Sequence, residues 1–433
     1  MRNCVAALLF LALVPGLARA GEPETWVVAV DRWGNTEYRE AVIETEAGVV
    51  SGRLGDWAVA GQRTGADIAF VATDSGGDVY RFSGTVAGDA LSGTADYPDT
   101  NGSDARVSHA VTGRRLALPP EGPPRRVTFE PTTWSNTFTA DRAPVLVIRP
   151  GDVIATRTID SGGVDAAGET RALYGNPQTG PFYVAGAKPG DILAIHIRRL
   201  TLNRDYADSL DDLVGRAMTT RLAAQASGLG ERVRWRLDRA AGTARLEDPP
   251  EHLKDYVVPV RPMLGGLGVA PDFGYAPFSA GDTGRFGGNM DFNQIREGAT
   301  VYLGVSQPGA LLYLGDGHAL QGDGETTQWA LETSLDVEFS VEVLPARPMS
   351  APRVETADRI SVIGQAGSLD EAVRAATSAM VQWLGQDYQL TVTESALILG
   401  TAAEYRVVTL AGRNAGIALS LDKARLATLR RQP

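Results

Sequence analysis

Short runs of β-branched and aromatic residues, separated by turns rich in glycine, asparagine and aspartate, recur along most of this chain. In its first quarter such runs occupy residues 26–30, 41–43, 68–71 and 79–82. Glycine supplies 49 of the 433 residues without a strict period, so it marks turns rather than a collagen-like repeat. Short strands alternating with turns predict a small antiparallel β-barrel or sandwich over residues 21–115.

The first twenty residues have the pattern of a secretory signal peptide. Arg2 precedes an apolar stretch over residues 5–14, and an Ala-Arg-Ala cleavage pattern ends at Ala20. The apolar stretch is too short to span a membrane. Cleavage would remove Cys4, the single cysteine, and would exclude disulfides, thiolate ligands and a cysteine nucleophile from the mature chain. We therefore expect a periplasmic or secreted protein without a membrane span.

The charge and composition narrow the class of protein further. The chain has 41 basic and 52 acidic residues, a formal net charge of −11, and no block of basic residues. This disfavours nucleic acid as a partner. Hydrophobic residues make up 43% and charged residues 21%, which is typical of a folded globular protein rather than a disordered one.

A proline-rich segment divides the chain. Four prolines fall within residues 116–124, which predicts a stiff, extended linker. The part that follows, residues 125–433, again contains strand-like runs, at 145–148, 153–156 and 192–197. The linker therefore predicts a boundary between the small β domain and a larger second domain.

Three helices are expected within the second domain. Apolar residues at helical spacing predict one from Ser209 to about Ser227. Capping-box patterns begin the other two, at Ser368 and at Thr391. Two adjacent helices after a long run of strands predict a β-rich α+β domain with its helices on one side.

Histidine occurs only four times, and His318 stands out because acidic residues surround it in the sequence. His109 lies among polar residues and is expected on the surface. A strand-like run leads into a glycine-punctuated loop with five polar side chains, namely Asp316, His318, Gln321, Asp323 and Glu325. In an extended backbone Asp316 and His318 project to one side.

The carboxylates of this loop would repel one another if they lay close together, unless a cation lay between them. One imidazole with carboxylate oxygens suits zinc or another divalent ion. The loop does not have the spacing of an EF-hand calcium site. A polar, glycine-rich surface turn is the alternative interpretation.

Two further polar segments are candidate parts of a site. Asn289 and Asp291 follow a pair of glycines, and Asp160 ends a predicted strand. Taken alone, each segment is better explained as a turn that ends a strand. The sequence contains no Gly-x-Ser-x-Gly elbow and no glycine-rich phosphate loop, which disfavours serine acyl transfer and nucleotide hydrolysis.

These segments together resemble the acetamidase/formamidase family. The stretch 176–191 resembles its most recognisable motif, and the segments 149–160, 262–271, 287–291 and 315–325 are similar to other motifs of the family, in the same order. A C-terminal segment, 393–406, is similar to the end of the family's domain. The resemblance covers about residues 125 to 425, and it does not cover the signal peptide or residues 21–115.

The resemblance implies a β-sandwich-like core with accessory C-terminal helices. It also implies hydrolysis of a short-chain amide, of formamide or acetamide type, to a carboxylate and ammonia. A divalent metal is implied as cofactor, with zinc as first candidate and calcium as the alternative, and so is a homodimer or higher homo-oligomer. The small amide is the expected partner.

The resemblance also suggests roles for the polar residues. The expected metal ligands are His318, Asp316, Asp160 and Asp323. The expected substrate-binding residues are Asn289, Asp291 and Gln321. The expected catalytic residues are Glu325, Asp323 and His318, with Glu325 as the first candidate for moving a proton beside the metal.

Two other functions are compatible with the sequence. The chain could be a secreted binding protein that kept the fold and lost catalysis, or a hydrolase of another linear or cyclic amide. The complete set of carboxylates with His318 argues against the binding protein, because a clustered set of charges is costly without its metal.

Overall fold

The computed structural model describes residues 23–102 and 105–430, so the predicted signal peptide lies outside the described residues. These residues divide into two compact units. One unit consists of the chain up to Trp33 together with residues 39–116, and the other consists of residues 34–38 and the chain from 117 onward.

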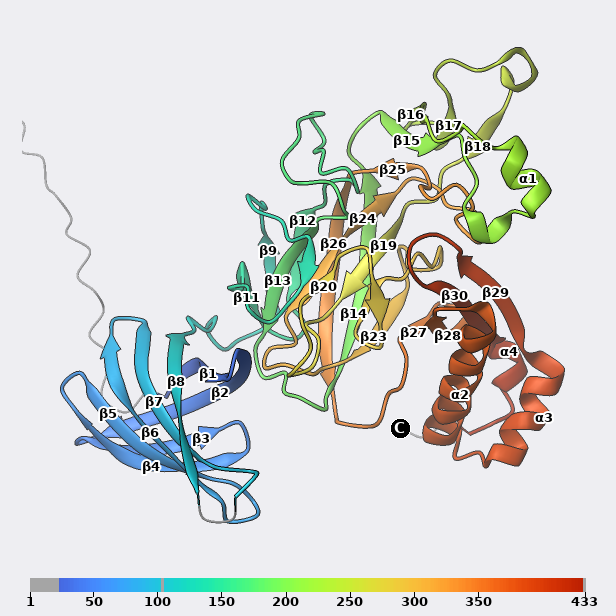
Figure 1. The fold of residues 1–433 in the computed structure, drawn as a ribbon. Helices are drawn as coiled ribbons and strands as arrows, with labels where there is room; N and C mark the ends of the chain where they lie inside the picture. Colours follow the sequence, from blue (N-terminus) through green and yellow to red (C-terminus); the bar gives the residue numbers. More distant parts are fainter. Residues whose placement is uncertain (1–22, 103–104, 431–433) are drawn as a thin grey trace, which may run out of the picture. The chain divides into compact units, whose positions relative to one another are not determined.

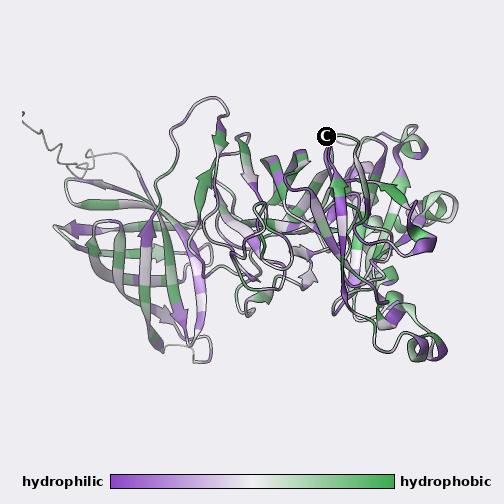
Figure 2. Ribbon diagram, turned by 90° about the horizontal axis from the view of Figure 1, so that it is seen from above, coloured by the Kyte–Doolittle hydropathy of each residue, from purple (hydrophilic) through white to green (hydrophobic). Residues whose placement is uncertain are grey.

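The first unit is a closed antiparallel barrel of eight strands (Figure 1). The strands are β1 (Glu24–Arg32), β2 (Asn35–Glu46), β3 (Val49–Leu54), β4 (Trp57–Thr64), β5 (Asp67–Thr73), β6 (Val79–Ala87), β7 (Ala90–Pro98) and β8 (Arg106–Arg115). Pairing of β1 with β8 closes the barrel. Hydrophobic and hydrophilic residues alternate along its strands (Figure 2), and the inward set, including Val30, Phe70 and Tyr97, is buried. The predicted small antiparallel β domain is therefore confirmed.

His109 lies inside this barrel and not on its surface. Its side chain is 4% exposed, and its Nδ1 atom lies 3.0 Å from the backbone oxygen of Asp31. The imidazole meets the rings of Trp33 and Tyr97 edge-on. The prediction that His109 lies on the surface was wrong. It rested on the polar residues next to His109 in the sequence, whereas in the folded barrel aromatic rings contact its imidazole.

The second unit is built on two large sheets. The eleven-stranded sheet has the order β18-β17-β16-β15-β25-β24-β19-β22-β21, with β13 paired to β24 and β11 paired to β13. Its strands are β11 (Leu146–Ile148), β13 (Gln178–Val184), β15 (Tyr206–Leu210), β16 (Arg232–Asp238), β17 (Thr243–Leu246), β18 (Val257–Pro259), β19 (Met263–Gly268), β21 (Thr283–Gly284), β22 (Gly287–Asn289), β24 (Leu312–His318) and β25 (Glu332–Thr333).

The nine-stranded sheet has the order β29-β30-β28-β27-β23-β14-β26-β12-β9. Its strands are β9 (Arg126–Thr128), β12 (Val153–Arg157), β14 (Ile192–Leu202), β23 (Thr300–Gly304), β26 (Leu335–Leu344), β27 (Arg353–Glu355), β28 (Arg359–Ala366), β29 (Glu404–Thr409) and β30 (Ala415–Asp422). A separate two-stranded ribbon pairs β10 (Thr137–Phe138) with β20 (Phe278–Ser279).

The two sheets share a buried core. Phe182 of β13 and Phe339 of β26 are fully buried, and their ring centroids lie 5.3 Å apart. Strands β13, β19 and β24 are buried along their whole length, as expected for strands covered on both faces. The predicted β-rich, sandwich-like core is confirmed.

Two helices lie between β28 and β29 in the chain, and a third follows β30. Helix α2 (Leu369–Tyr388) packs on β28 and β30 and buries Met380 and Trp383 (Figure 1). Helix α3 (Val392–Ala402) begins with the capping box predicted at Thr391. A last short helix, α4 (Lys423–Leu426), follows β30. The two capping patterns therefore predicted helix starts correctly.

The helix predicted from Ser209 to about Ser227 was mostly wrong. Ser209 belongs to β15, where it pairs with Val233 of β16. A single 3-10 turn (Gly215–Ala217) and a short helix α1 (Thr220–Gln225) occupy the rest, and α1 buries no residue. Apolar residues at helical spacing stabilise a helix only when they pack against a core, and here pairing between strands determines the structure instead.

Within residues 23–102 and 105–430, no helix is long and apolar enough to cross a membrane.

Candidate metal centre

Five buried titratable side chains meet at one end of β24. We call them the acidic cluster, and they are Asp291, Asp316, His318, Glu325 and Glu332, each 6% exposed or less. Asp316 and His318 end β24, and Glu332 begins β25, which pairs with His318. Asp291 follows β22, which pairs with β19, and β19 pairs with β24. Sheet pairing therefore brings distant parts of the chain to one point.

The backbone around the cluster is held in a conformation that side chains usually avoid. Asp291, Asp316 and Glu325 have φ angles of 48°, 55° and 43°, and neighbouring Asn176 has 56°. Residues other than glycine rarely adopt positive φ, and glutamate does so less readily than aspartate or asparagine. Strain of this kind persists where the surroundings impose it, and it concentrates at functional sites.

Gly265 in β19 lies directly against the carboxylates of Asp316 and Asp291. A Cβ atom at this position would lie 2.4 Å from Oδ2 of Asp316 and 2.6 Å from Oδ1 of Asp291. No side chain fits in that space. The backbone of β19 therefore approaches the two acids closely because residue 265 is glycine.

The hydrogen bonds of Gln321 fix the orientation of His318. The Nε2 atom of Gln321 donates to the backbone oxygens of Asp291, at 2.5 Å, and of Val408, at 3.3 Å. Its Oε1 atom must then accept from Nδ1 of His318, 2.8 Å away. The lone pair of the neutral imidazole therefore lies on Nε2, the arrangement typical of a metal-binding histidine.

Nε2 of His318 faces two carboxylates. It lies 3.4 Å from Oδ1 of Asp316 and 3.3 Å from Oε1 of Glu332. Nε2, Oδ1 of Asp316 and Oε2 of Glu332 are buried without a hydrogen-bond partner, and so is Oδ1 of Asp291. Buried polar atoms are nearly always satisfied, and these four atoms lie together, so they are available to bind one cation between them.

A second pair of carboxyl groups adjoins this set. Asp291 and Glu325 could hold an ion together with His318, just as Asp316 and Glu332 could. Thr409 of β29 donates to Oε2 of Glu325 over 3.0 Å, and Asn289 donates to Oδ2 of Asp291 over 2.5 Å. Glu325 and Asp291 are thus oriented by their own hydrogen-bond donors.

The cluster carries more negative charge than its surroundings balance. Burial, followed by the charge of Asp316, raises the pKa of Asp291 to about 8. Burial likewise raises the pKa of Glu325, where the charge of Asp291 adds to it, and the pKa of Glu332. Burial alone would lower the pKa of His318, but Glu332 and Asp316 raise it well above its usual value.

These observations test whether a cation fits the site. Among the described residues, no lysine or arginine forms an ion pair with the four carboxylates of the cluster. One imidazole nitrogen and several carboxylate oxygens are ligands that zinc accepts, and a carboxylate-rich set also suits harder divalent ions. The donor set, its burial and its orphaned atoms therefore fit a divalent metal.

Two predicted ligands lie outside the cluster. Asp323 is an exposed residue paired with Arg406, with oxygen-to-nitrogen distances of 2.5 and 2.8 Å. Asp160 forms a buried ion pair with Arg204 at 2.7 Å. Each carboxylate already has a cation of its own, so the structure does not bring either into the candidate metal centre.

The remaining predicted residues lie in or beside the cluster. Asp316, His318, Glu325 and Asp291 belong to it. Asn289 is half-buried, and its Oδ1 accepts from Asn176, 2.7 Å away. Gln321 uses both ends of its amide within the protein, as described above, so it supports His318 and has no free donor for a substrate.

Sequence reasoning missed Glu332 and Asn176. Nδ2 of Asn176 donates to Asn289 and, over 3.1 Å, to Oδ2 of Asp316. Asn176 begins the stretch 176–191, so a signal for it was present. No local pattern marks Glu332, because pairing of β25 with β24 alone brings it to His318.

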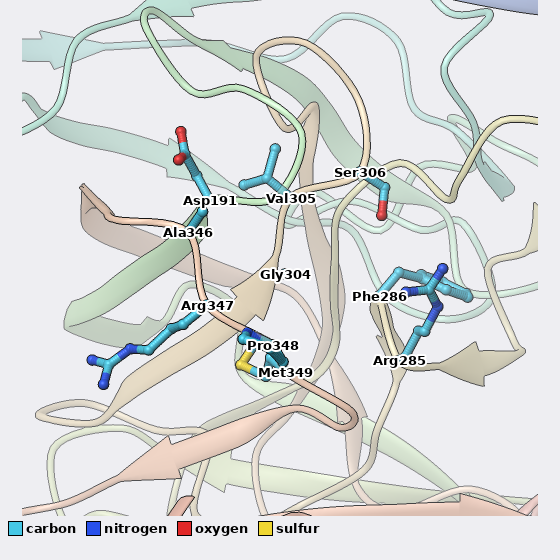
Figure 3. A pocket seen from close by; sticks show the side chains of 11 residues that line it. Asp191, Arg285, Phe286, Gly304, Val305, Ser306, Ala346, Arg347, Pro348 and Met349 are labelled. Atoms are coloured by element: carbon cyan, nitrogen blue, oxygen red, sulfur yellow. The ribbon is translucent and has the colours of Figure 1, made fainter. Parts of the chain in front are cut away.

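A pocket of about 400 Å³ elsewhere in the same unit shares no residue with the cluster (Figure 3). Val305, Phe286 and Met349 line it, with Arg285 and Arg347 at its sides. Both arginines already pair with carboxylates, of Asp272 and Asp387 respectively. This pocket therefore offers mainly apolar walls, and we assign the chemistry to the cluster.

Comparisons with known proteins bear on the family and the fold of the chain. The family model described as "Acetamidase/Formamidase family" matches residues 281–383, which include all five residues of the cluster. A search of curated proteins found no match.

Three solved structures are similar to the chain. A predicted acetamidase/formamidase from Thermoanaerobacter tengcongensis is 27% identical with a TM-score of 0.62, and the alignment covers 71% of this chain and 98% of that one. An acetamidase from Bacillus halodurans is 25% identical (TM-score 0.61, coverage 70% and 99%). An acetamidase from Yersinia enterocolitica is also 25% identical (TM-score 0.60, coverage 70% and 94%).

Proposed function

We propose, from the family model that matches residues 281–383 and from the three similar solved structures, that the chain is a member of the acetamidase/formamidase family and a metal-dependent hydrolase of linear amides. The reaction cleaves the C–N bond of a short-chain amide and yields a carboxylate and ammonia. The observation that carries the proposal is the set of four orphaned polar atoms on Asp291, Asp316, His318 and Glu332, buried in the segment that the family model matches.

Asp316, His318 and Glu332 would hold the metal, with zinc as first candidate and calcium as the alternative. Nε2 of His318 carries the free lone pair and faces both carboxylates. Gln321 holds the imidazole in that orientation. A bound divalent ion would polarise the amide carbonyl and make a water molecule more acidic.

Glu325 and Asp291 are the proposed acid–base pair. Amide hydrolysis needs a group that takes a proton from the attacking water and one that gives a proton to the leaving amine. Glu325 is held by Thr409, and Asp291 is held by Asn289. Both carboxyl groups lie beside the proposed metal ligands, so neither needs to move far.

The half-buried carboxamides of Asn176 and Asn289 are the proposed contacts for the substrate amide. They are the more exposed polar groups in contact with the cluster. A carboxamide side chain offers both a donor and an acceptor, which matches the two ends of a primary amide.

Metal analysis with matched variants tests the proposal. We expect His318→Ala and Glu332→Gln to lose most of the bound metal and the activity with it. Asp323→Asn is the control, since Asp323 is exposed and paired with Arg406, and it should retain wild-type metal content. Equal metal content in all three variants would contradict the ligand assignment.

Ammonia release from a panel of amides separates the hydrolase from the alternative of a non-catalytic binding protein. The hydrolase should release ammonia from at least one linear primary amide, and Glu325→Gln should slow this release about 100- to 10,000-fold. A metal-loaded protein that binds amides without releasing ammonia would be a binding protein. Release from lactams alone would favour a cyclic-amide hydrolase.

We also propose that the protein is exported to the periplasm or secreted, and that it acts as a homo-oligomer. The export proposal is supported by the signal-peptide pattern of residues 1–20.

We further propose that residues 125–433 carry all the chemistry. The domain proposal is supported by the position of the cluster, which lies entirely after the proline-rich segment 116–124. A chain beginning near Arg125 that is folded yet inactive would contradict it.

A further inference from the structure

Two of the side chains that contact the acidic cluster, Asn176 and Asn289, are partly exposed to solvent. The five cluster residues are almost fully buried, whereas Asn176 and Asn289, which contact Asp316 and Asp291, are half-buried. A substrate that reaches the cluster from this partly exposed side would meet these two carboxamides first.

Three apolar side chains lie on the loops that carry Asn176, Glu325 and Glu332, and we call them the entrance rim: Leu173, Tyr174 and Trp329. Consecutive Cα atoms are about 3.8 Å apart, so the Cα atom of Tyr174 lies within about 7.6 Å of that of Asn176. Trp329 lies in the loop between Glu325 and Glu332, both of which are in the cluster. The rim thus belongs to the same two loops that carry site residues.

The rim is an ordered aromatic surface. Nε1 of Trp329 donates to the hydroxyl of Tyr174 over 3.3 Å, and the two ring centroids lie 6.0 Å apart. Their polar atoms thus satisfy each other, which leaves the ring faces for an apolar ligand.

The loop that carries Leu173 and Tyr174 is fixed to the rest of the domain. Nδ2 of Asn136 lies within 3.2 Å of the backbone oxygens of residues 173, 174 and 175. The backbone nitrogens of residues 175 and 176 donate to the oxygen of Ser161. The loop is therefore preorganised, which lowers the entropy that binding would otherwise cost.

Leu173 and Tyr174 are nevertheless 81% and 62% exposed. Apolar side chains held outward on a fixed backbone lose the stabilisation that burial would give, so exposed ones beside a site indicate a surface that something covers.

We propose that the entrance rim binds an apolar substituent of the substrate, so that the preferred substrates are primary amides with an alkyl or aryl group larger than the methyl of acetamide. This inference rests on the proposed amide hydrolysis. Acetamide would fill only the space at the carboxamides, whereas a longer chain would extend from the cluster across the rim.

A series of linear primary amides tests the inference. A fully buried methylene group contributes about fourfold to binding, and we expect about twofold on this open rim. Between acetamide and hexanamide, which differ by four methylenes, kcat/KM should therefore rise about 16-fold at about twofold for each. The double variant Leu173→Ser, Tyr174→Ser should lose most of this rise.

The control is Leu397→Ser in α3, where an equally apolar side chain is 69% exposed and lies outside the rim. It should keep the full dependence on chain length. The measurement uses the metal-loaded full chain, with circular dichroism to show that each variant is folded.

The outcomes are distinguishable. Equal kcat/KM for acetamide and hexanamide would overturn the inference and leave the proposed hydrolysis intact. No ammonia from any amide in the metal-loaded protein would overturn the proposed function itself. A rise that the rim variant retains, with loss of self-association in sedimentation, would assign the rim to an interface between copies and overturn the inference.

Discussion

Substitution of Gly265 by alanine is the sharpest test of the acidic cluster, because it changes no titratable group. The backbone of Gly265 does not lie in the left-handed region, so alanine can adopt it. The new Cβ atom would lie 2.4 Å from Oδ2 of Asp316 and 2.6 Å from Oδ1 of Asp291, where ordinary contact begins at 3.4 Å. The two carboxylates must therefore move by about 1.0 and 0.8 Å (3.4 − 2.4 and 3.4 − 2.6).

A displacement of this size should be costly for catalysis. Misplacing a catalytic group by about 1 Å lowers the rate about 100-fold, whereas overpacking a buried position costs about 1–3 kcal/mol of stability. We expect Gly265→Ala to bind metal more weakly and to lose about 100-fold in kcat/KM while it stays folded. The assays are metal content, ammonia release and urea denaturation.

Gly322 provides a matched control in the loop that leads to Glu325. A Cβ atom there would meet nothing within 4 Å. Gly322→Ala should therefore leave metal content and activity unchanged. If Gly265→Ala retains activity within twofold of wild type and full metal content, the positions of the two carboxylates do not matter and our reasoning about the site is refuted.

Three further predictions follow from other residues. Glu325→Gln should lower kcat about 100- to 10,000-fold with metal content unchanged; loss of metal would make Glu325 a ligand instead. Asp160→Asn should lower the free energy of unfolding by about 3–5 kcal/mol, because it leaves the buried charge of Arg204 without its carboxylate partner. The variant should keep its metal. A variant of normal stability that lacks metal would show that Asp160 is a metal ligand. Burial alone would raise the pKa of Asp152, but hydrogen bonds from Arg125 lower that pKa in the folded protein. The ionised Asp152 therefore stabilises the fold at any pH above its unfolded pKa, and this stabilisation is lost as the pH falls through its folded pKa. Urea denaturation between pH 7 and pH 3 should show a weaker dependence of stability on pH in Asp152→Asn than in the wild type.

The site was only partly predictable from local sequence. The loop from Asp316 to Glu325 was recognisable, because one imidazole and several carboxylates within a few residues is an unusual composition. The structure brings Asp316, His318 and Glu325 into one cluster with Asp291. Asp323 was grouped with them by the same spacing, and in the structure it faces outward and pairs with Arg406. Spacing along the chain therefore indicated the region but not each member.

Elements whose signals are local were predicted well. The capping boxes at Ser368 and Thr391 mark the starts of α2 and α3, because capping depends on residues within one turn. The strand and turn alternation of residues 21–115 predicted an antiparallel β domain, because inward and outward positions alternate along each strand. The strand at Ser209 was missed, since it forms by pairing with Val233 of β16.

The sequence alone determined the residue types available to this protein: several carboxylates near one histidine, no cysteine after the predicted cleavage site, and many short strand-forming runs separated by turns. Only the tertiary structure decided which carboxylates share the site. Pairing of β25 with β24 brings Glu332 to His318. The hydrogen bond between Gln321 and Nδ1 of His318 leaves the lone pair of the imidazole on Nε2, which faces Glu332. These choices depend on contacts between residues far apart in the chain, and no local pattern encodes such contacts.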